Sequence, residues 1–241
     1  MSVAYNPQTV TDGLVLYLDA ANTKSYPGTG TSWTDLSVNR IVGTLTSGPT
    51  FSSLNKGCFV FDGIDDYVNL GSSNAITGNN LTTITLEVWV KYSSTGPGRL
   101  IAIQRGSGGL NSSLAAMQVN VNQGVTTAGY LQFVTRNSTN SNVEYLNLNG
   151  NYHLVGTFQN FVATITGTSR ALYVNGDLVA SDTVTGLPSL TNNTDPALVG
   201  IQPGLTSPFD GTIAIVKVYN RALSQNEVRQ NFNALRGRFG V

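Results

Sequence analysis

Three aspartates gather in one short segment and are the first residues to consider for chemistry. Asp62, Asp65 and Asp66 lie within residues 59–70, where an acidic turn centred on Gly63 joins two apolar runs. Carboxylate oxygens are preferred ligands of Ca²⁺, which binds about six to eight oxygens. Aspartate also builds turns, because its side chain accepts hydrogen bonds from its own backbone. The segment predicts a turn that joins two strands, with a calcium site at these three aspartates as the alternative.

Glycoside hydrolysis would need two carboxyl groups roughly 5 to 10 Å apart, usually on strand positions that face one cleft. The glutamates Glu87, Glu144 and Glu227 are widely separated in the sequence. The positions two and four residues after Glu87 hold Trp89 and Lys91, so no acidic partner follows it. We therefore predict no catalytic residue and expect that the protein is not an enzyme.

Histidine and cysteine each occur once, which excludes the usual zinc sites. We expect His153, at the start of a predicted strand, to have a structural role, and Cys58, beside an apolar run, to be a buried thiol. The glycine-rich residues 106–109 are not followed by the Lys-Ser/Thr pair of a phosphate-binding loop. No cofactor is predicted apart from the calcium alternative.

Two aromatic residues stand out in the polar loop at residues 22–34. Tyr26 and Trp33 are its only large side chains, and we expect Trp33 to anchor the loop on the core. The alternative is a carbohydrate-stacking surface, because loops often carry binding residues and aromatic rings stack on sugars. Tyr130 is the third aromatic residue considered for this role.

Composition restricts the partners of the protein. Only 11% of its 241 residues are charged, 26 are glycine, and the formal net charge is zero. A neutral chain has no field that would attract phosphate backbones or anionic lipids, so we expect no nucleic-acid or membrane binding. No basic and apolar N-terminal signal is visible, and the apolar runs are too short to span a membrane.

Short apolar or alternating segments, separated by Gly, Asn and Ser, predict an all-β antiparallel sandwich. Residues 84–91 alternate cleanly, Asn175-Gly176 is a strong hairpin signal, and residues 212–219 have the pattern of a central strand. The predicted strands are 13–19, 84–91, 100–104, 116–121, 130–135, 143–148, 153–158, 161–165, 171–180, 197–201 and 212–219.

One short C-terminal helix is predicted, because Ser224 and Glu227 form a capping-box pattern ahead of apolar residues at helical spacing. The terminal residues 236–241 are expected to form an arm that docks on the domain or on a neighbouring subunit. We divide the chain into a sandwich domain, 1–222, and a C-terminal helix and arm, 223–241.

Six segments carry a family pattern in order along nearly the whole chain. They are LVLYLDA (14–20), SYPG (25–28), WTDLS (33–37), FDGIDDY (61–67), LYVNG (172–176) and VYNRALS (218–224). This pattern resembles the laminin-G-like branch of the concanavalin A-like lectin/glucanase superfamily. The resemblance implies a jelly-roll β-sandwich but no particular activity, since the superfamily includes lectins, hydrolases, adhesion modules and structural parts.

The first two segments and the ending FNALRGR (232–238) resemble, more narrowly, versions found in tailed-bacteriophage virion proteins. This resemblance implies a virion protein, such as a capsid decoration or tail-associated subunit, assembled in the host cytoplasm. Its partners would be other virion proteins or copies of itself. In these related sequences the tryptophan segment usually ends in Ser-Gly-Asn-Gly. This sequence has Ser-Val-Asn-Arg at that place, residues 37–40.

The alternative hypothesis is a carbohydrate-binding module that attaches to host or environmental polysaccharide. In that case Tyr26, Trp33 and Tyr130 would stack on sugars, and calcium would assist binding. The two hypotheses are compatible, because a displayed lectin could tether a particle to polysaccharide.

Overall fold

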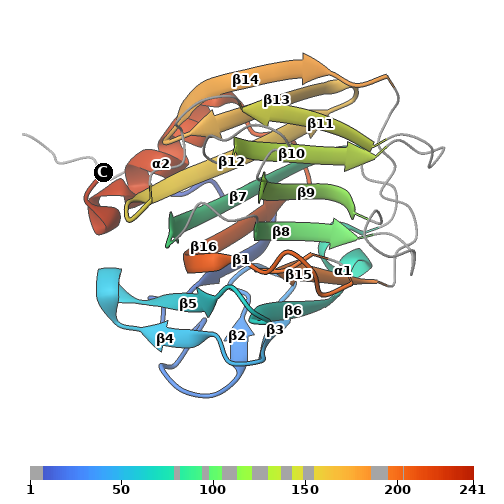
Figure 1. Cartoon of the computed structure of the whole chain (residues 1–241). Coiled ribbons are helices and arrows are strands. Elements are labelled where there is room, and N and C mark those ends of the chain that lie inside the picture. The colour runs from blue at the N-terminus through green and yellow to red at the C-terminus, as the bar shows by residue number, and fades with distance from the viewer. Residues whose placement is uncertain are drawn as a thin grey trace, which may run out of the picture.

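Two antiparallel sheets face each other in the computed structural model (Figure 1). It describes residues 8–78, 82–93, 98–104, 113–120, 130–136, 143–148, 155–185, 195–202 and 204–241. Sheet A contains, in spatial order, β14 (Asp177–Thr183), β13 (Ser169–Val174), β12 (Phe158–Thr166), β7 (Thr83–Tyr92), β16 (Asp210–Tyr219), β5 (Cys58–Asp62) and β4 (Thr50–Ser52), and β1 (Leu14–Asp19) also pairs with β16. Sheet B contains β11 (Val143–Leu148), β10 (Tyr130–Arg136), β9 (Ser113–Asn120), β8 (Gly98–Gln104), β15 (Pro196–Val199), β6 (Tyr67–Ser72), β3 (Val42–Thr46) and β2 (Ser32–Thr34). The all-β sandwich predicted from the sequence is confirmed.

The main core lies between the sheets and follows the period-two alternation of the strands. Ile84, Leu86, Val88 and Val90 on β7 all enter it and are fully buried. Burial of each such side chain contributes roughly 1.5–3 kcal/mol. The alternation that predicted this strand therefore also identifies its core face.

Strand β16 is the centre of sheet A, as its apolar sequence predicted. It pairs with β7 along one edge, and with β5 and then β1 along the other, so that Ile213 is opposite Phe59 and Val216 is opposite Leu18. Nearly every residue of β16 is buried, including Lys217. Both faces of this strand are thus covered.

Helix α2 (Gln225–Phe239) covers the outer face of sheet A and forms a third layer (Figure 1). Trp89 of β7 stacks on two helix residues, with ring centroids 4.3 Å from Phe239 and 5.7 Å from Phe232. Residues of β7 that alternate away from the main core are therefore buried beneath the helix. The helix itself packs against the jelly roll through this aromatic cluster.

The predicted capping box of α2 is confirmed, because Ser224 accepts a hydrogen bond from the Glu227 backbone while the Glu227 side chain accepts one from Ser224. The expected arm from residue 236 onward is corrected. The helix continues through Phe239 and ends at Gly240, which has a left-handed φ of 73°. Gly237 does not end the helix, and the docked Phe239 holds the last turn in place.

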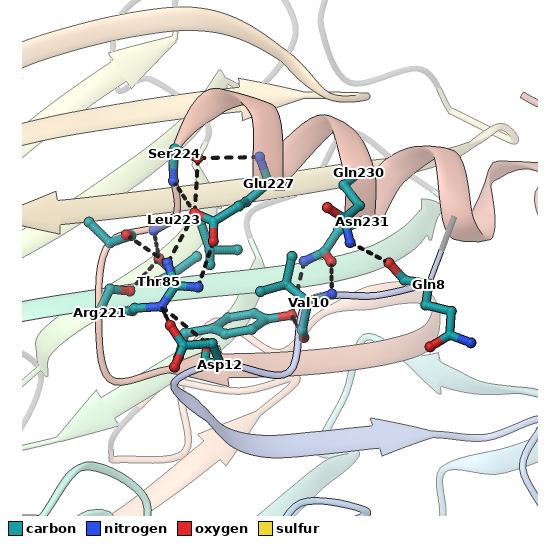
Figure 2. A network of polar contacts seen from close by, with 12 residues as sticks. Gln8, Val10, Asp12, Thr85, Arg221, Leu223, Ser224, Glu227, Gln230 and Asn231 are labelled. Atoms are coloured by element: carbon teal, nitrogen blue, oxygen red, sulfur yellow. Dashed lines mark hydrogen bonds and ion pairs between the residues drawn. The ribbon is translucent and has the colours of Figure 1, made fainter. Parts of the chain in front are cut away.

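The N-terminal segment 8–13 lies against α2 (Figure 2). The backbone N–H of Val10 donates to Oδ1 of Asn231 at 2.8 Å, and Nε2 of Gln230 donates to the carbonyl of Gln8, also at 2.8 Å. Arg221 contacts Asp12 and Glu227 at 2.8 and 2.6 Å. These contacts join the first described residues to the C-terminal helix.

Two short helices, α1 (Ser73–Thr77) and η1 (Leu54–Lys56), are too short to give a helical period and were missed in the sequence. The predicted strand 153–158 is also corrected: β12 begins at Phe158, and Val155 makes only an isolated bridge to Tyr92. His153 and residues 106–109 lie outside the described residues. No described helix has the length and apolar character needed to cross a membrane.

Candidate functional site

The acidic segment forms the turn between β5 and β6, and its own hydrogen bonds build it. The Asp62 backbone N–H donates to Oδ2 of Asp66 at 3.0 Å, and the Ile64 N–H donates to Oδ1 of Asp62 at 2.8 Å. Gly63 has φ 76°, a conformation that glycine adopts at little cost. The predicted strand-joining turn is therefore confirmed.

The same turn brings the three aspartates together. Asp62 and Asp65 are exposed, Asp66 is 3% exposed, and ligand oxygens of all three lie within 4.8 Å of one another. Asp210 is opposite Asp62 in the β5–β16 ladder, and none of the ion pairs among the described residues involves these four. Burial raises the pKa of Asp66, and the charges of Asp62 and Asp65 raise it further against the lowering effect of the Asp62 N–H. The donor set suits a hard cation, and calcium stays a prediction here.

Tyr26 and Trp33 lie in the main core. Trp33 is fully buried and Tyr26 is 5% exposed; each ring centroid lies 4.8 Å from that of Phe59. The Tyr26 hydroxyl donates to the Gly30 carbonyl at 3.0 Å. Neither ring offers a face on which a sugar could stack, which corrects the stacking hypothesis for both and leaves the core-anchor interpretation. The side chain of Tyr130 lies outside the described ones, and its backbone pairs with Asn120.

The three glutamates considered for hydrolysis have different surroundings in the fold. Glu87 is fully buried beside Lys217, Glu144 accepts hydrogen bonds from Thr185, and Glu227 caps α2. Cys58 is buried as expected, and burial raises the pKa of its thiol. Each of these groups has a structural role in its surroundings.

A row of polar residues crosses the outer face of sheet B, which points away from sheet A. Asn147 is opposite Gln132, Gln132 is opposite Gln118, and Gln118 is opposite Arg99 in consecutive ladders. The neighbours of Gln132 and Asn147 along β10 and β11 enter the main core; they are Leu131, Phe133, Leu146 and Leu148. By the alternation of strand residues, Gln132 and Asn147 face outward.

Two side-chain hydrogen bonds involve residues of this row, and one of them adds Gln202, which follows β15. Nε2 of Gln132 donates to Oδ1 of Asn147 at 2.7 Å, and Nη2 of Arg99 donates to Oε1 of Gln202 at 2.6 Å. We call Asn147, Gln132, Arg99 and Gln202 the polar row. The polar row was not predicted, because the sequence pattern of these strands was not resolved into two faces. The signal was present as single polar residues between apolar ones at positions 131–133 and 146–148.

Tyr145 lies beside the polar row on the same face of β11, two residues before Asn147. Its side chain is 47% exposed, and its ladder partner Val134 is 5% exposed and contacts Ala102. This part of sheet B thus combines an exposed ring, amide groups and a guanidinium. Such a set can stack on a sugar ring and exchange hydrogen bonds with its hydroxyls.

Solved structures similar in fold include proteins that bind sugars. The binding domain of botulinum neurotoxin DC in complex with SialylT has a TM-score of 0.66 and 14% identity, covering 93% of this chain and 52% of that one. Domain 4 of AbnA, an extracellular arabinanase from Geobacillus stearothermophilus, in complex with arabinotriose, has a TM-score of 0.65 and 15% identity, covering 92% and 99%. Trypanosoma rangeli sialidase in complex with the inhibitor DANA has a TM-score of 0.64 and 15% identity, covering 95% and 35%.

At these identities the likeness shows the fold alone. This chain spans about half the length of the neurotoxin binding domain and nearly all of the arabinanase domain. No curated protein matches the sequence. A family profile does match it over residues 62–229, from the acidic turn into helix α2, which is more than half of the chain. The chain therefore belongs to the concanavalin A-like lectin/glucanases superfamily.

Proposed function

We propose that this protein is a carbohydrate-binding module that binds polysaccharide through the outer face of sheet B without transforming it. The observation that carries the proposal is the polar row beside the exposed ring of Tyr145. Sugar hydroxyls both donate and accept hydrogen bonds, and the exposed amide of Asn147, held by Gln132, offers both functions. The Tyr145 ring supplies an apolar face for the C–H side of a sugar.

Similar folds support this proposal. The arabinanase domain is nearly the same length as this chain and was solved with arabinotriose, and the neurotoxin binding domain was solved with SialylT. The jelly roll alone is thus large enough to form a sugar-binding module. The virion structural role expected from the narrower sequence resemblance stays a prediction, and the structures named above are not virion proteins.

A glycan array followed by calorimetry on the bound glycan tests the proposal. We expect Tyr145→Ala and Asn147→Ala each to weaken binding about tenfold, which corresponds to about 1.4 kcal/mol. Leu178→Ala is the control for Tyr145, because Leu178 is 46% exposed on sheet A, and Asn233→Ala on the exposed side of α2 is the control for Asn147. Absence of binding across the array, or equal binding by all four variants, would refute the proposal.

The same assay tests calcium at Asp62, Asp65 and Asp66. If calcium assists binding, a chelator abolishes it and added Ca²⁺ restores it, and Asp65→Asn has the effect of the chelator. If the aspartates only build the turn, binding is the same with and without chelator, and Asp65→Asn binds as the parent protein does.

A further inference from the structure

Arg99 is a buried arginine that has no anionic partner among the residues the structure describes. Its residue is 4% exposed, and Nη2 donates to Gln202 at 2.6 Å. The Nε and Nη1 atoms are both buried, and no group in the described part of the chain accepts a hydrogen bond from them. Gln202 is neutral, so the positive charge of Arg99 is not balanced in this contact.

Arg170 is a buried arginine of the same protein in which all three guanidinium nitrogens donate hydrogen bonds. It is 3% exposed, and its Nε and Nη2 atoms donate to the two oxygens of Asp182 at 2.9 and 2.6 Å. Its Nη1 donates to Thr135 Oγ1 at 2.8 Å and to the Glu144 carbonyl at 3.0 Å. Of the two arginines that are buried in the described part of the chain, Arg99 is the one without a carboxylate.

The missing acceptors make Arg99 costly to the fold. A buried donor left without an acceptor destabilises the fold, and more so when it is charged. Burial lowers the pKa of Arg99 to about 10, with the nearby Tyr145 opposing the shift, so the guanidinium is still protonated at neutral pH. It therefore cannot relieve the cost by losing its proton.

Arg99 belongs to the polar row, on the face where the proposed function places the glycan. Its backbone N–H donates to the Ser207 carbonyl at 3.2 Å, which fixes the start of β8 against the loop after β15. Tyr145 and the Gln132–Asn147 pair lie further along the same face. A group that reaches Arg99 from this face would also contact those residues.

A carboxylate suits the guanidinium of Arg99 better than a hydroxyl does. It is planar, accepts several N–H donors and supplies the opposite charge. A neutral sugar hydroxyl could accept one of these donors but would leave the buried charge unbalanced. Building on the proposed function, we propose that the glycan bound by sheet B is acidic, and that Arg99 binds the carboxylate of a uronic or sialic acid residue.

The burial of Arg99 has a kinetic consequence. With the residue only 4% exposed, a carboxylate must displace neighbouring groups before it reaches the guanidinium. Association that requires such rearrangement is slower than the usual rate of about 10⁵–10⁷ M⁻¹s⁻¹. The carboxylate of the ligand is expected to become buried beside Arg99 rather than to rest on the protein surface.

The test compares acidic glycans with neutral versions of themselves. Polygalacturonate and 3′-sialyllactose are the two probes, each alongside its carboxyl-reduced derivative, and each is measured once with added Ca²⁺ and once with chelator. We expect at least one acidic probe to bind, and its reduced derivative to bind at least tenfold more weakly. The probe that binds distinguishes a uronic from a sialic acid.

Arg99→Gln is the decisive variant, and Arg229→Gln is its control for charge. Arg229 pairs with Asp177 on the surface, with side chains 51% and 71% exposed, so its loss removes one positive charge far from β8. Arg99→Gln should lose at least tenfold in affinity for the acidic probe while its melting temperature is unchanged or higher, because an unbalanced buried charge is removed. If the role of Arg99 were purely structural, Arg99→Gln would instead lower the melting temperature.

If Arg99→Gln does not fold, the side-chain Nε–H signal of Arg99 in the parent protein replaces it. That signal should shift on addition of trigalacturonate or 3′-sialyllactose and stay unchanged with the reduced sugar. Equal binding of acidic and reduced probes, full affinity in Arg99→Gln, or an unchanged signal during binding overturns the inference but leaves the proposed function intact. Failure to bind any glycan overturns both.

Discussion

Lys217 Nζ lies 3.2 Å from Oε1 of Glu87, and neither side chain has any exposed surface. The two residues are opposite each other on the neighbouring strands β16 and β7, beneath α2. Asn231 of the helix donates to Oε2 of Glu87 at 2.7 Å, and Asn160 of β12 donates to Oε1 at 3.3 Å. Burial lowers the pKa of Lys217, and Glu87 opposes that shift. This network joins two central strands to the helix that covers them.

We predict that Lys217→Met lowers the free energy of unfolding by about 3–5 kcal/mol, because it leaves the Glu87 carboxylate buried without a cation. The double variant Lys217→Met with Glu87→Leu should lose less than Lys217→Met alone, since no buried charge is left. Urea unfolding measures both. A double variant less stable than Lys217→Met would contradict this account, while Arg229→Met, at an exposed ion pair, should change stability by no more than about 1 kcal/mol.

Phe239 is expected to anchor the last turn of α2 on Trp89. Phe239→Ala should lower the free energy of unfolding by about 3 kcal/mol, because the ring is 7% exposed and stacks 4.3 Å from Trp89. The exposed Asn233→Ala on the same helix should change it by less than about 0.5 kcal/mol. Sedimentation measures the oligomeric state of the same variant. If Phe239→Ala changes the oligomeric state but not the stability, the residue docks on a neighbouring subunit and the prediction is wrong.

The fold was predictable where the local pattern and tertiary packing agree. Asn175 and Gly176 have φ values of 51° and 86°, as the predicted hairpin requires, and the capping box at Ser224 and Glu227 is present. The position of α2 was not predictable, because alternation in β7 does not show whether Glu87 and Trp89 face solvent or another layer. The third layer appears only in the tertiary structure, where Asn231 of the helix donates to Glu87 and Phe239 stacks on Trp89.

Gly63 lies at the centre of the acidic turn and has a positive φ of 76°. We expect Gly63→Val to lower the free energy of unfolding by about 2 kcal/mol or more, from backbone strain together with a clash. Its Cβ would lie 2.8 Å from Cβ of Asp210, whereas a Cβ at Gly71, with a similar φ of 72°, would meet nothing within 4 Å. Gly71→Val therefore serves as the control for strain alone. Equal losses in the two variants would show that the clash is absent.

The candidate site was less predictable than the fold. Polar side chains from strands β8, β10 and β11 form the polar row only after the ladders set their register, and Gln202 follows β15 from much later in the chain. The stacking alternative for Tyr26 and Trp33 was wrong for a related reason, whereas the expected core anchor at Trp33 is confirmed. A loop that folds back onto the core buries its aromatic residues, and sequence position alone does not distinguish such a loop from an exposed one.

The ion pair at the start of α2 gives a pH-dependent prediction. Arg221 contacts Glu227 at 2.6 Å, and its hydrogen bonds are the main reason that the pKa of Glu227 falls to about 2. A carboxyl group with a lowered pKa stabilises the fold above its unfolded pKa of about 4.3, and this contribution is lost as pH falls through the folded value. The Glu227 contribution should therefore be full above about pH 5 and decline toward about pH 2.

Glu227→Gln isolates the charge, because glutamine also fits a capping box. At neutral pH we expect this variant to be less stable than the parent protein by about 1–2 kcal/mol, a value for a partly exposed charged hydrogen bond. Urea midpoints measured from neutral pH down to about pH 2.5 should show the difference shrinking, since the parent carboxyl becomes protonated in the unfolded and then the folded state. Asp12→Asn, at an 84% exposed side chain that also contacts Arg221, should change stability much less. A difference for Glu227→Gln that stays constant with pH would mean that hydrogen-bond geometry rather than charge holds this end of the helix.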